Sequence, residues 1–157
     1  MAAKLLGKVV GGLTDVHTTQ QNPLGQRSFG YNSSDQLCEF IYLKGVASLV
    51  AEDFVVYDEN YATTRAIADE VGPVAVAMAA VDATTEYGWF QIFGPATGDT
   101  ATVAADKALY LTSTAGRLDD SDVAGDSVHG CFSMAADSSN SCSVFLNYPF
   151  VTDIAHD

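Results

Sequence analysis

A short sequence cassette occurs twice in this chain, and its spacing constrains the fold more than any single residue does. The first copy contains Phe54-Val-Val-Tyr57, Thr64-Arg65, Gly72, Val74–Met78 and Trp89-Phe-Gln-Ile-Phe93. The second copy contains Ala108-Leu-Tyr-Leu111, Gly116-Arg117, Gly125, Val128–Met134 and Ser143-Val-Phe-Leu-Asn147. Each copy has the order strand, turn, basic residue, acidic turn, strand and strand, which is typical of a small β-meander. The repeat predicts an architecture and places no nucleophile beside a base.

Seven short runs rich in β-branched and aromatic residues are expected to form strands, because turn-forming residues separate them. These runs are Phe40–Leu43, Phe54–Tyr57, Val74–Ala77, Trp89–Phe93, Ala108–Leu111, Val128–Met134 and Ser143–Leu146. The only helical alternative is Tyr61–Val71, where the match to the turn before Arg117 favours loop and strand. The sequence therefore predicts an all-β fold, a compact antiparallel β-barrel or sandwich built from two meander-like repeats, with an extended N-terminal arm.

Residues 1–36 differ from the rest, and we assign them to the extended N-terminal arm, with the antiparallel β domain at residues 37–157. The segment Thr18–Ser34 is rich in polar residues and Gly and shows no sustained periodicity. Such a segment either is a mobile terminus or becomes ordered against a neighbouring subunit. The second alternative is favoured by apolar residues that a solvated tail would not need, namely Leu5, Leu6, Val9, Val10 and Leu13.

Acidic residues dominate the charge of the chain. Asp and Glu number 20 against 7 Lys and Arg, which gives a formal net charge of -13 at pH 7. Bare nucleic acid and anionic membranes would be repelled by such a surface, so we expect neither as a partner. No apolar run approaches the roughly 18 residues that span a bilayer, and the N-terminus lacks the arrangement of a secretory signal. We therefore expect synthesis in the cytoplasm.

The sequence carries no pattern that indicates catalysis or metal binding. The spacing of His17, His129 and His156 forms no cluster, and no serine lies in a recognisable nucleophile motif. The acidic turn Asp119–Asp122, followed by Asp126, lacks the residue order of a calcium loop and is interpreted as a solvated turn. We therefore expect no enzymatic activity, no cofactor and no metal.

Two pairs of residues have structural alternatives that the sequence leaves open. Arg65 and Arg117 occupy equivalent places in the two cassettes, and local salt links to the acidic turns are favoured over ligand recognition. Cys131 and Cys142 could approach each other on one hairpin, and buried free thiols are favoured over a disulfide.

Aromatic residues near the ends of both cassettes recur at two-residue spacing. We interpret them mostly as core residues, because alternate side chains of a strand face the same side; they are Trp89, Phe90, Phe93, Phe132, Phe145, Tyr148 and Phe150. Pro149 ends ladder pairing, so Tyr148 and Phe150 either close the core or lie at a subunit contact.

Six segments carry a resemblance that spans nearly the whole chain. They are Gln21-Asn-Pro-Leu-Gly25, Phe40-Ile-Tyr-Leu-Lys-Gly-Val46 leading to Phe54-Val-Val-Tyr-Asp58, Gly72-Pro-Val-Ala-Val-Ala-Met78, Tyr87-Gly-Trp-Phe-Gln-Ile-Phe-Gly94 and Leu109-Tyr-Leu-Thr-Ser-Thr-Ala-Gly116. Through these segments and the order in which they occur, the chain resembles the decoration, or cement, proteins of tailed-bacteriophage capsids. The resemblance implies a small β-rich protein that binds outside an assembled shell, commonly as a trimer at symmetry axes, and stiffens it against internal DNA pressure.

The expected function is therefore that of a non-enzymatic structural virion protein on the capsid exterior. The expected partners are the major capsid protein and further copies of the chain, which would form a homotrimer. The candidate contact residues are Pro23, Leu24, Arg27, Phe29, Tyr148 and Phe150. The alternative is a tail- or fibre-associated module that binds host surface glycan through exposed aromatic residues. A small hydrolase would need a convergent polar pocket, which the sequence does not indicate.

Overall fold

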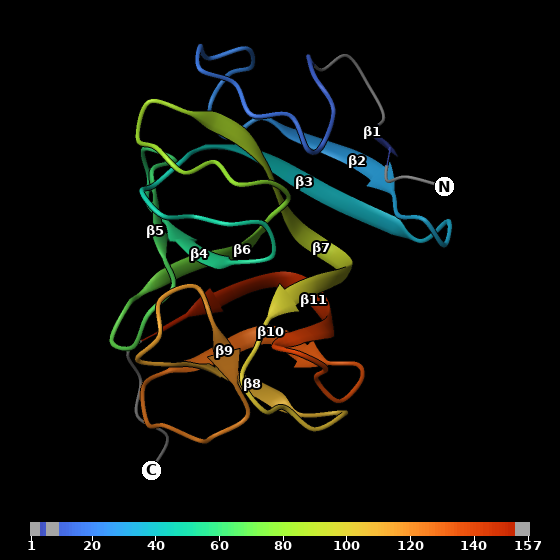
Figure 1. Ribbon diagram of the computed structural model, residues 1–157, viewed down its shortest axis with the longest axis vertical. Helices are drawn as coiled ribbons and strands as arrows, with labels where there is room; N and C mark the ends of the chain where they lie inside the picture. The colour runs from blue at the N-terminus through green and yellow to red at the C-terminus, as the bar shows by residue number, and fades with distance from the viewer. Residues whose placement is uncertain (1–3, 6–9, 153–157) are drawn as a thin grey trace.

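The computed structural model describes the backbone of Lys4–Leu5 and all of residues 10–152, and these residues form a single antiparallel β-sheet without a helix (Figure 1). The strands are β1 Lys4–Leu5, β2 Arg27–Tyr31, β3 Leu37–Lys44, β4 Phe54–Tyr57, β5 Thr63–Arg65, β6 Gly72–Ala77, β7 Tyr87–Asp99, β8 Ala108–Leu111, β9 Leu118–Asp119, β10 Ser127–Ser133 and β11 Ser141–Val151. The predicted all-β antiparallel class is confirmed.

The strongest strand predictions also have nearly the right bounds. Six of the seven predicted runs lie within observed strands, Val128–Met134 extends one residue beyond β10, and the bounds of β4 and β8 agree residue for residue. These runs form strands because branched and aromatic side chains pack well on a pleated sheet surface. The segment Tyr61–Val71 is not helical, and β5 lies within it, as expected.

The two cassettes repeat one pairing scheme. In the first, β4 pairs with β5 and β6, and β6 pairs with β7. In the second, β8 pairs with β9 and β10, and β10 pairs with β11. Isolated parallel bridges join Lys44 to Ala62 in the first set and Thr100 to Leu118 in the second. Each of these two contacts is a single bridge and not a ladder of paired residues. The strands therefore form one open sheet, and the buried side chains form several separate hydrophobic clusters.

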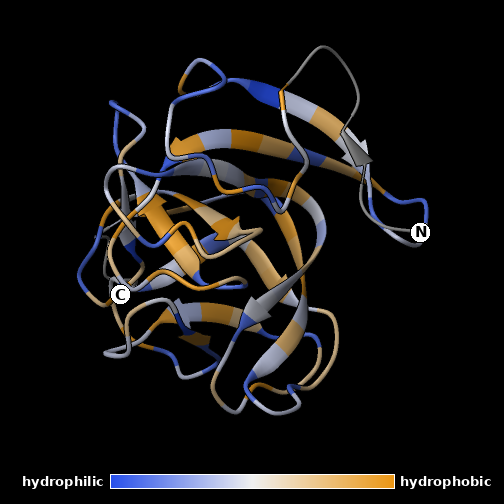
Figure 2. Ribbon diagram, turned by 45° about the horizontal axis from the view of Figure 1, so that its top comes forward, coloured by the Kyte–Doolittle hydropathy of each residue, from blue (hydrophilic) through white to orange (hydrophobic). Residues whose placement is uncertain are grey.

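The long strand β7 connects the two sets, since it pairs with β3 through its first half and with β11 through its second half. Adjacent residues of β7 enter different cores. Trp89 packs with Leu13 and Tyr42, whereas Phe90 packs with residues of β4 and β6. This division follows from the alternation of side chains along a strand. In Figure 2 much of the strongest hydrophobic colour lies on the strands.

The described part of the predicted arm, residues 10–36, packs against the β domain. Position 36 lies in the turn of the hairpin formed by β2 and β3, which pair from Arg27 with Ile41 to Tyr31 with Leu37. Upstream of this hairpin, Leu13 is buried against the core, and the backbone of His17 exchanges two hydrogen bonds with Tyr87. Residues 10–36 therefore fold onto their own domain, because the outer side of β3 and β7 is apolar and needs a cover. The predicted anchors Leu5, Leu6 and Val9 lie outside the residues whose side chains are described.

Replacing Gly94 with alanine is expected to lower the free energy of unfolding by about 2 kcal/mol. Gly94 has a φ of 93°, and an added Cβ would lie 2.5 Å from the carbonyl oxygen of Leu37. The matched control is Gly12→Ala, because the nearest atom to an added Cβ is there 3.6 Å away. Urea denaturation followed by circular dichroism measures both variants. Equal stability of the two would contradict the constraint at Gly94.

Candidate functional site

Four aromatic side chains on β7, β10 and β11 form a continuous row, which we call the aromatic row. The ring of Phe93 lies 5.3 Å from that of Tyr148 and 5.8 Å from that of Phe145, measured between centroids. Phe145 in turn stacks on Phe132 at 5.6 Å. Tyr148 and Phe132, at the two ends of the row, are each 45% exposed.

The row faces outward because the opposite side of the same strands is already occupied. Val144 and Leu146 of β11 are buried in the core, so Phe145 between them points to the other side. Phe132 lies directly opposite Phe145 in the ladder between β10 and β11. The interpretation of these aromatic residues as mostly core is therefore correct for Trp89 and Phe90 and wrong for the aromatic row, because alternation alone does not say which of two apolar faces is buried.

A paired charge lies next to the exposed end of the row. The Tyr148 hydroxyl donates a hydrogen bond of 2.5 Å to Glu39, which is buried in β3. Arg27 lies 3.6 Å from the same carboxylate and places its guanidinium carbon 5.9 Å from the centre of the Tyr148 ring. The hydrogen bond to Glu39 raises the pKa of the Tyr148 phenol above its ordinary value. Because Glu39 is paired with Arg27, this end of the row carries no net charge.

The structure brings four of the six candidate contact residues to this region. Tyr148 belongs to the row, and Arg27 contacts it. Phe29 is exposed directly opposite Glu39 in the ladder of β2 and β3, and Phe150 is exposed and stacks on the ring of His129. We call the aromatic row together with Arg27, Phe29, Glu39, His129 and Phe150 the aromatic face. Exposure of Tyr148 and Phe150 excludes the alternative that they close the core.

The other two candidates lie apart from the aromatic face. Leu24 is half-buried and packs against the core beneath the N-terminal segment, while Pro23 is exposed next to it. The backbone nitrogen of Gly25 donates to the carbonyl oxygen of Tyr42, which holds this turn on the domain. Leu24 therefore has a structural role. Phe93, Phe132 and Phe145 were not among the candidate contact residues, although they lie on the aromatic face.

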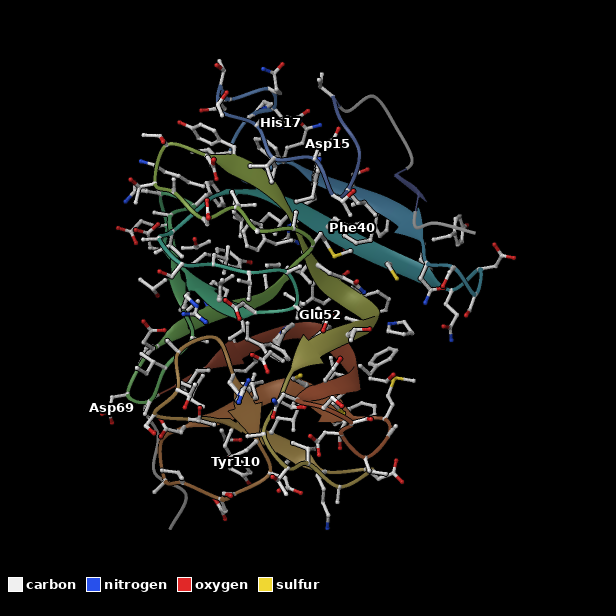
Figure 3. The ribbon with its side chains drawn as sticks, viewed as in Figure 1. Asp15, His17, Phe40, Glu52, Asp69 and Tyr110 are labelled. Carbon is white, nitrogen blue, oxygen red and sulfur yellow. The ribbon has the colours of Figure 1, made fainter. Side chains whose placement is uncertain are left out.

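A groove of about 460 Å³ lies beside the row, between the turn of the β2–β3 hairpin and the ladder of β7 and β11. Met134 and Ser143 line it, and they lie two residues from Phe132 and Phe145, which places the groove on the same side of that ladder. Phe40 and Glu52 line it from β3 and from the loop before β4 (Figure 3). Neither residue was a candidate, since nothing local in the sequence brings them together.

The two repeated arginines bind aspartates outside their own acidic turns. Arg65 contacts the fully buried Asp53 at 2.8 Å, and Arg117 contacts Asp99 at 2.9 Å. The predicted local salt links are therefore wrong, because Asp53 and Asp99 come from strand ends that the fold brings to the arginines. Asp126 also departs from the expected solvated turn, since it is buried and accepts a hydrogen bond from the backbone of Asp69.

The cysteines are buried free thiols, as favoured from the sequence. Burial raises the pKa of Cys131 and that of Cys142, and at Cys142 the hydrogen bond to Ala135 only partly offsets it. Both side chains belong to the core cluster of β10 and β11, where they pack as small apolar groups. Thiols of this kind are poor nucleophiles at neutral pH.

In the described part of the chain, no group of three or more His, Cys, Asp and Glu side chains is arranged to hold a metal ion. The same residues contain no helix long and apolar enough to cross a membrane. Comparison of the chain with protein-family models, with curated proteins and with solved structures finds no match in any of the three.

Proposed function

We propose that this chain is a structural virion protein that binds the outer surface of an assembled tailed-phage capsid as a trimer and stabilises the shell without catalysing a reaction. The observation that carries the proposal is the aromatic face, a set of exposed and half-buried rings beside the paired charges of Arg27 and Glu39, on a protein whose formal net charge is -13. Exposed aromatic residues beside an arginine are typical of protein–protein contacts.

The charge distribution supports an adhesive role for this face. Copies that carry a large net charge repel one another in solution, which keeps them soluble until a specific contact holds them. At the aromatic face, Arg27 neutralises Glu39, so a shell subunit or another copy can approach there without an unpaired buried charge. Several copies held together on a shell then gain from multivalent attachment.

The resemblance to decoration proteins supports the capsid as the partner, and the all-β body is compatible with it. The major capsid protein would be the main partner, and the expected location is the exterior of the virion. The acidic surface disfavours adherence to packaged DNA.

Replacing Phe132 with serine is expected to lower the affinity for shells about tenfold while leaving the fold intact, because the side chain is half-exposed and packs only at the end of the row. The measurement is co-sedimentation with DNA-free shells of the phage that encodes the chain, over a concentration series. The control is Val16→Ser, an exposed apolar residue between Asp15 and His17 in the N-terminal segment (Figure 3). Failure of the unaltered protein to bind shells would refute the proposal.

The alternative function is binding of host surface glycan by a tail- or fibre-associated module. The same exposed rings favour it, since sugars stack on aromatic side chains. Imaging of labelled protein on virions separates the two functions. Signal over the whole head supports decoration, and signal confined to the tail supports glycan binding.

A further inference from the structure

The groove beside the aromatic row combines one polar and one apolar wall. The polar wall is the hairpin turn, with Asn32, Ser33, Ser34 and Gln36. The apolar wall contains Phe40, Val76, Met78 and Met134. Its volume of about 460 Å³ falls within the range of about 300–1,000 Å³ that is typical of ligand sites.

A single charged residue, Glu52, lines this groove. The Ser141 hydroxyl donates a hydrogen bond of 3.1 Å to one of its carboxylate oxygens. Its backbone has a φ of 75°, which is uncommon for a residue with a side chain. Hydrogen bonds on both sides hold this conformation, from the Glu52 nitrogen to the carbonyl of Ala77 and from the nitrogen of Asp99 to the carbonyl of Glu52, each at 2.9 Å. The carboxylate is therefore held in place before any partner arrives.

The floor of the groove is also fixed. The side-chain amide nitrogen of the buried Gln91 donates to the carbonyl oxygens of Phe93 and Pro95, at 3.0 and 2.9 Å. These bonds hold β7 in the irregular course that begins at its bulge opposite Glu39 and Phe40. A rigid floor with a fixed carboxylate loses little conformational entropy on binding.

We propose that this groove receives an extended segment of the shell protein in which one Lys or Arg stands between apolar residues, an assignment that rests on the proposed function. The cation would pair with Glu52, its aliphatic stem would lie along Met78 and Met134, and the hydroxyl and amide groups of the hairpin turn would bind the backbone of the segment. Charge complementarity carries the choice of partner, because a protein of charge -13 attracts basic segments and this groove offers them one carboxylate among neutral walls.

The N-terminal segment of a second copy is a less suitable occupant, although it contains Lys4 and Lys8 among apolar residues. Lys4 and Leu5 already pair with Tyr31 and Gly30 at the edge of β2. The side chain of Asn22 binds both the nitrogen and the carbonyl oxygen of Val10, each at 3.0 Å. Docking in a neighbouring groove would break this pairing.

The test uses fluorescently labelled peptides of about 12 residues that tile the shell protein, titrated with the full-length chain. We expect binding by peptides with one basic residue between apolar ones. Replacing that basic residue with norleucine should weaken binding about tenfold for the unaltered chain and at most twofold for Glu52→Gln. The control variant is Glu59→Gln, which makes the same change in charge on an exposed turn.

Three results would overturn the inference. They are the absence of binding by any shell peptide, equal affinities for Glu52→Gln and Glu59→Gln, and binding only by a peptide of residues 1–12 of this chain, which would assign the groove to a neighbouring copy. Co-sedimentation with shells separates this inference from the proposed function. Full binding of Glu52→Gln to shells refutes the groove and leaves the function standing, whereas the absence of shell binding by the unaltered chain refutes both.

Discussion

Replacing Trp89 with alanine is expected to lower the free energy of unfolding by about 4 kcal/mol, the largest effect of any single change considered. The side chain is fully buried between Leu13 of the N-terminal segment and Tyr42 of β3, whose ring centroid lies 5.2 Å from that of Trp89. Its removal leaves a cavity that the surrounding strands cannot fill, because both neighbouring strands are held in their ladders. Urea denaturation followed by far-ultraviolet circular dichroism measures the loss.

The conservative change Trp89→Phe is expected to cost about 1 kcal/mol. The indole nitrogen of Trp89 is buried and has no hydrogen-bond partner in the structure, so the smaller ring loses area but no hydrogen bond. A loss as large as that of the alanine variant would show that the indole N–H is bound. The signal must be circular dichroism, since the chain contains a single tryptophan.

Replacing Asp53 with alanine is expected to lower the free energy of unfolding by about 3 kcal/mol at neutral pH. Asp53 is fully buried, binds Arg65 at 2.8 Å and accepts a hydrogen bond from the nitrogen of Val50. Its removal leaves the arginine without its partner and the backbone group without its acceptor. The control Asp99→Ala, at the more exposed pair with Arg117, is expected to cost about 1 kcal/mol. Denaturation of both variants in the same buffer measures the difference.

The contribution of Asp53 to the free energy of unfolding is expected to fall as the pH rises, which is the opposite of the usual behaviour of a carboxylate beside an arginine. Burial raises the pKa of Asp53 above its ordinary value, and the hydrogen bond from Arg65 only partly offsets it. Between the ordinary pKa of 3.8 and the raised value, the folded state therefore holds this proton more tightly than the unfolded state does. The stability of the unaltered chain relative to Asp53→Asn should thus fall as the pH rises through this window. A relative stability that rises with pH would contradict the dominance of burial.

The predictions from the sequence succeeded where the pattern is local. Phe54–Tyr57 and Ala108–Leu111 are dense in β-formers and bounded by turn residues, so their strands could be assigned without tertiary information. The polar strand β2 was not assigned, because pairing with β3 makes it a strand in spite of its composition.

The candidate site was only partly accessible from the sequence. Tyr148 and Phe150 stood out because Pro149 follows the last predicted strand, and the structure places both on the aromatic face. Phe132 and Phe145 could not be recognised as surface residues, because their strands carry apolar residues on both sides. Only the packing decides which of the two sides is covered. Glu52 gave no signal at all, because the residues around it come from six separate segments, from the β2–β3 turn to β11.

Composition and periodicity determined the all-β antiparallel class and the acidic charge, because these properties depend on residue types and on spacing over a few residues. Only the tertiary structure decided which apolar side of β10 and β11 faces solvent, which aspartate each arginine binds, and that the hairpin turn and Glu52 enclose one groove. These outcomes depend on contacts between residues distant in the chain, and the pairing of strands through β7 selects them.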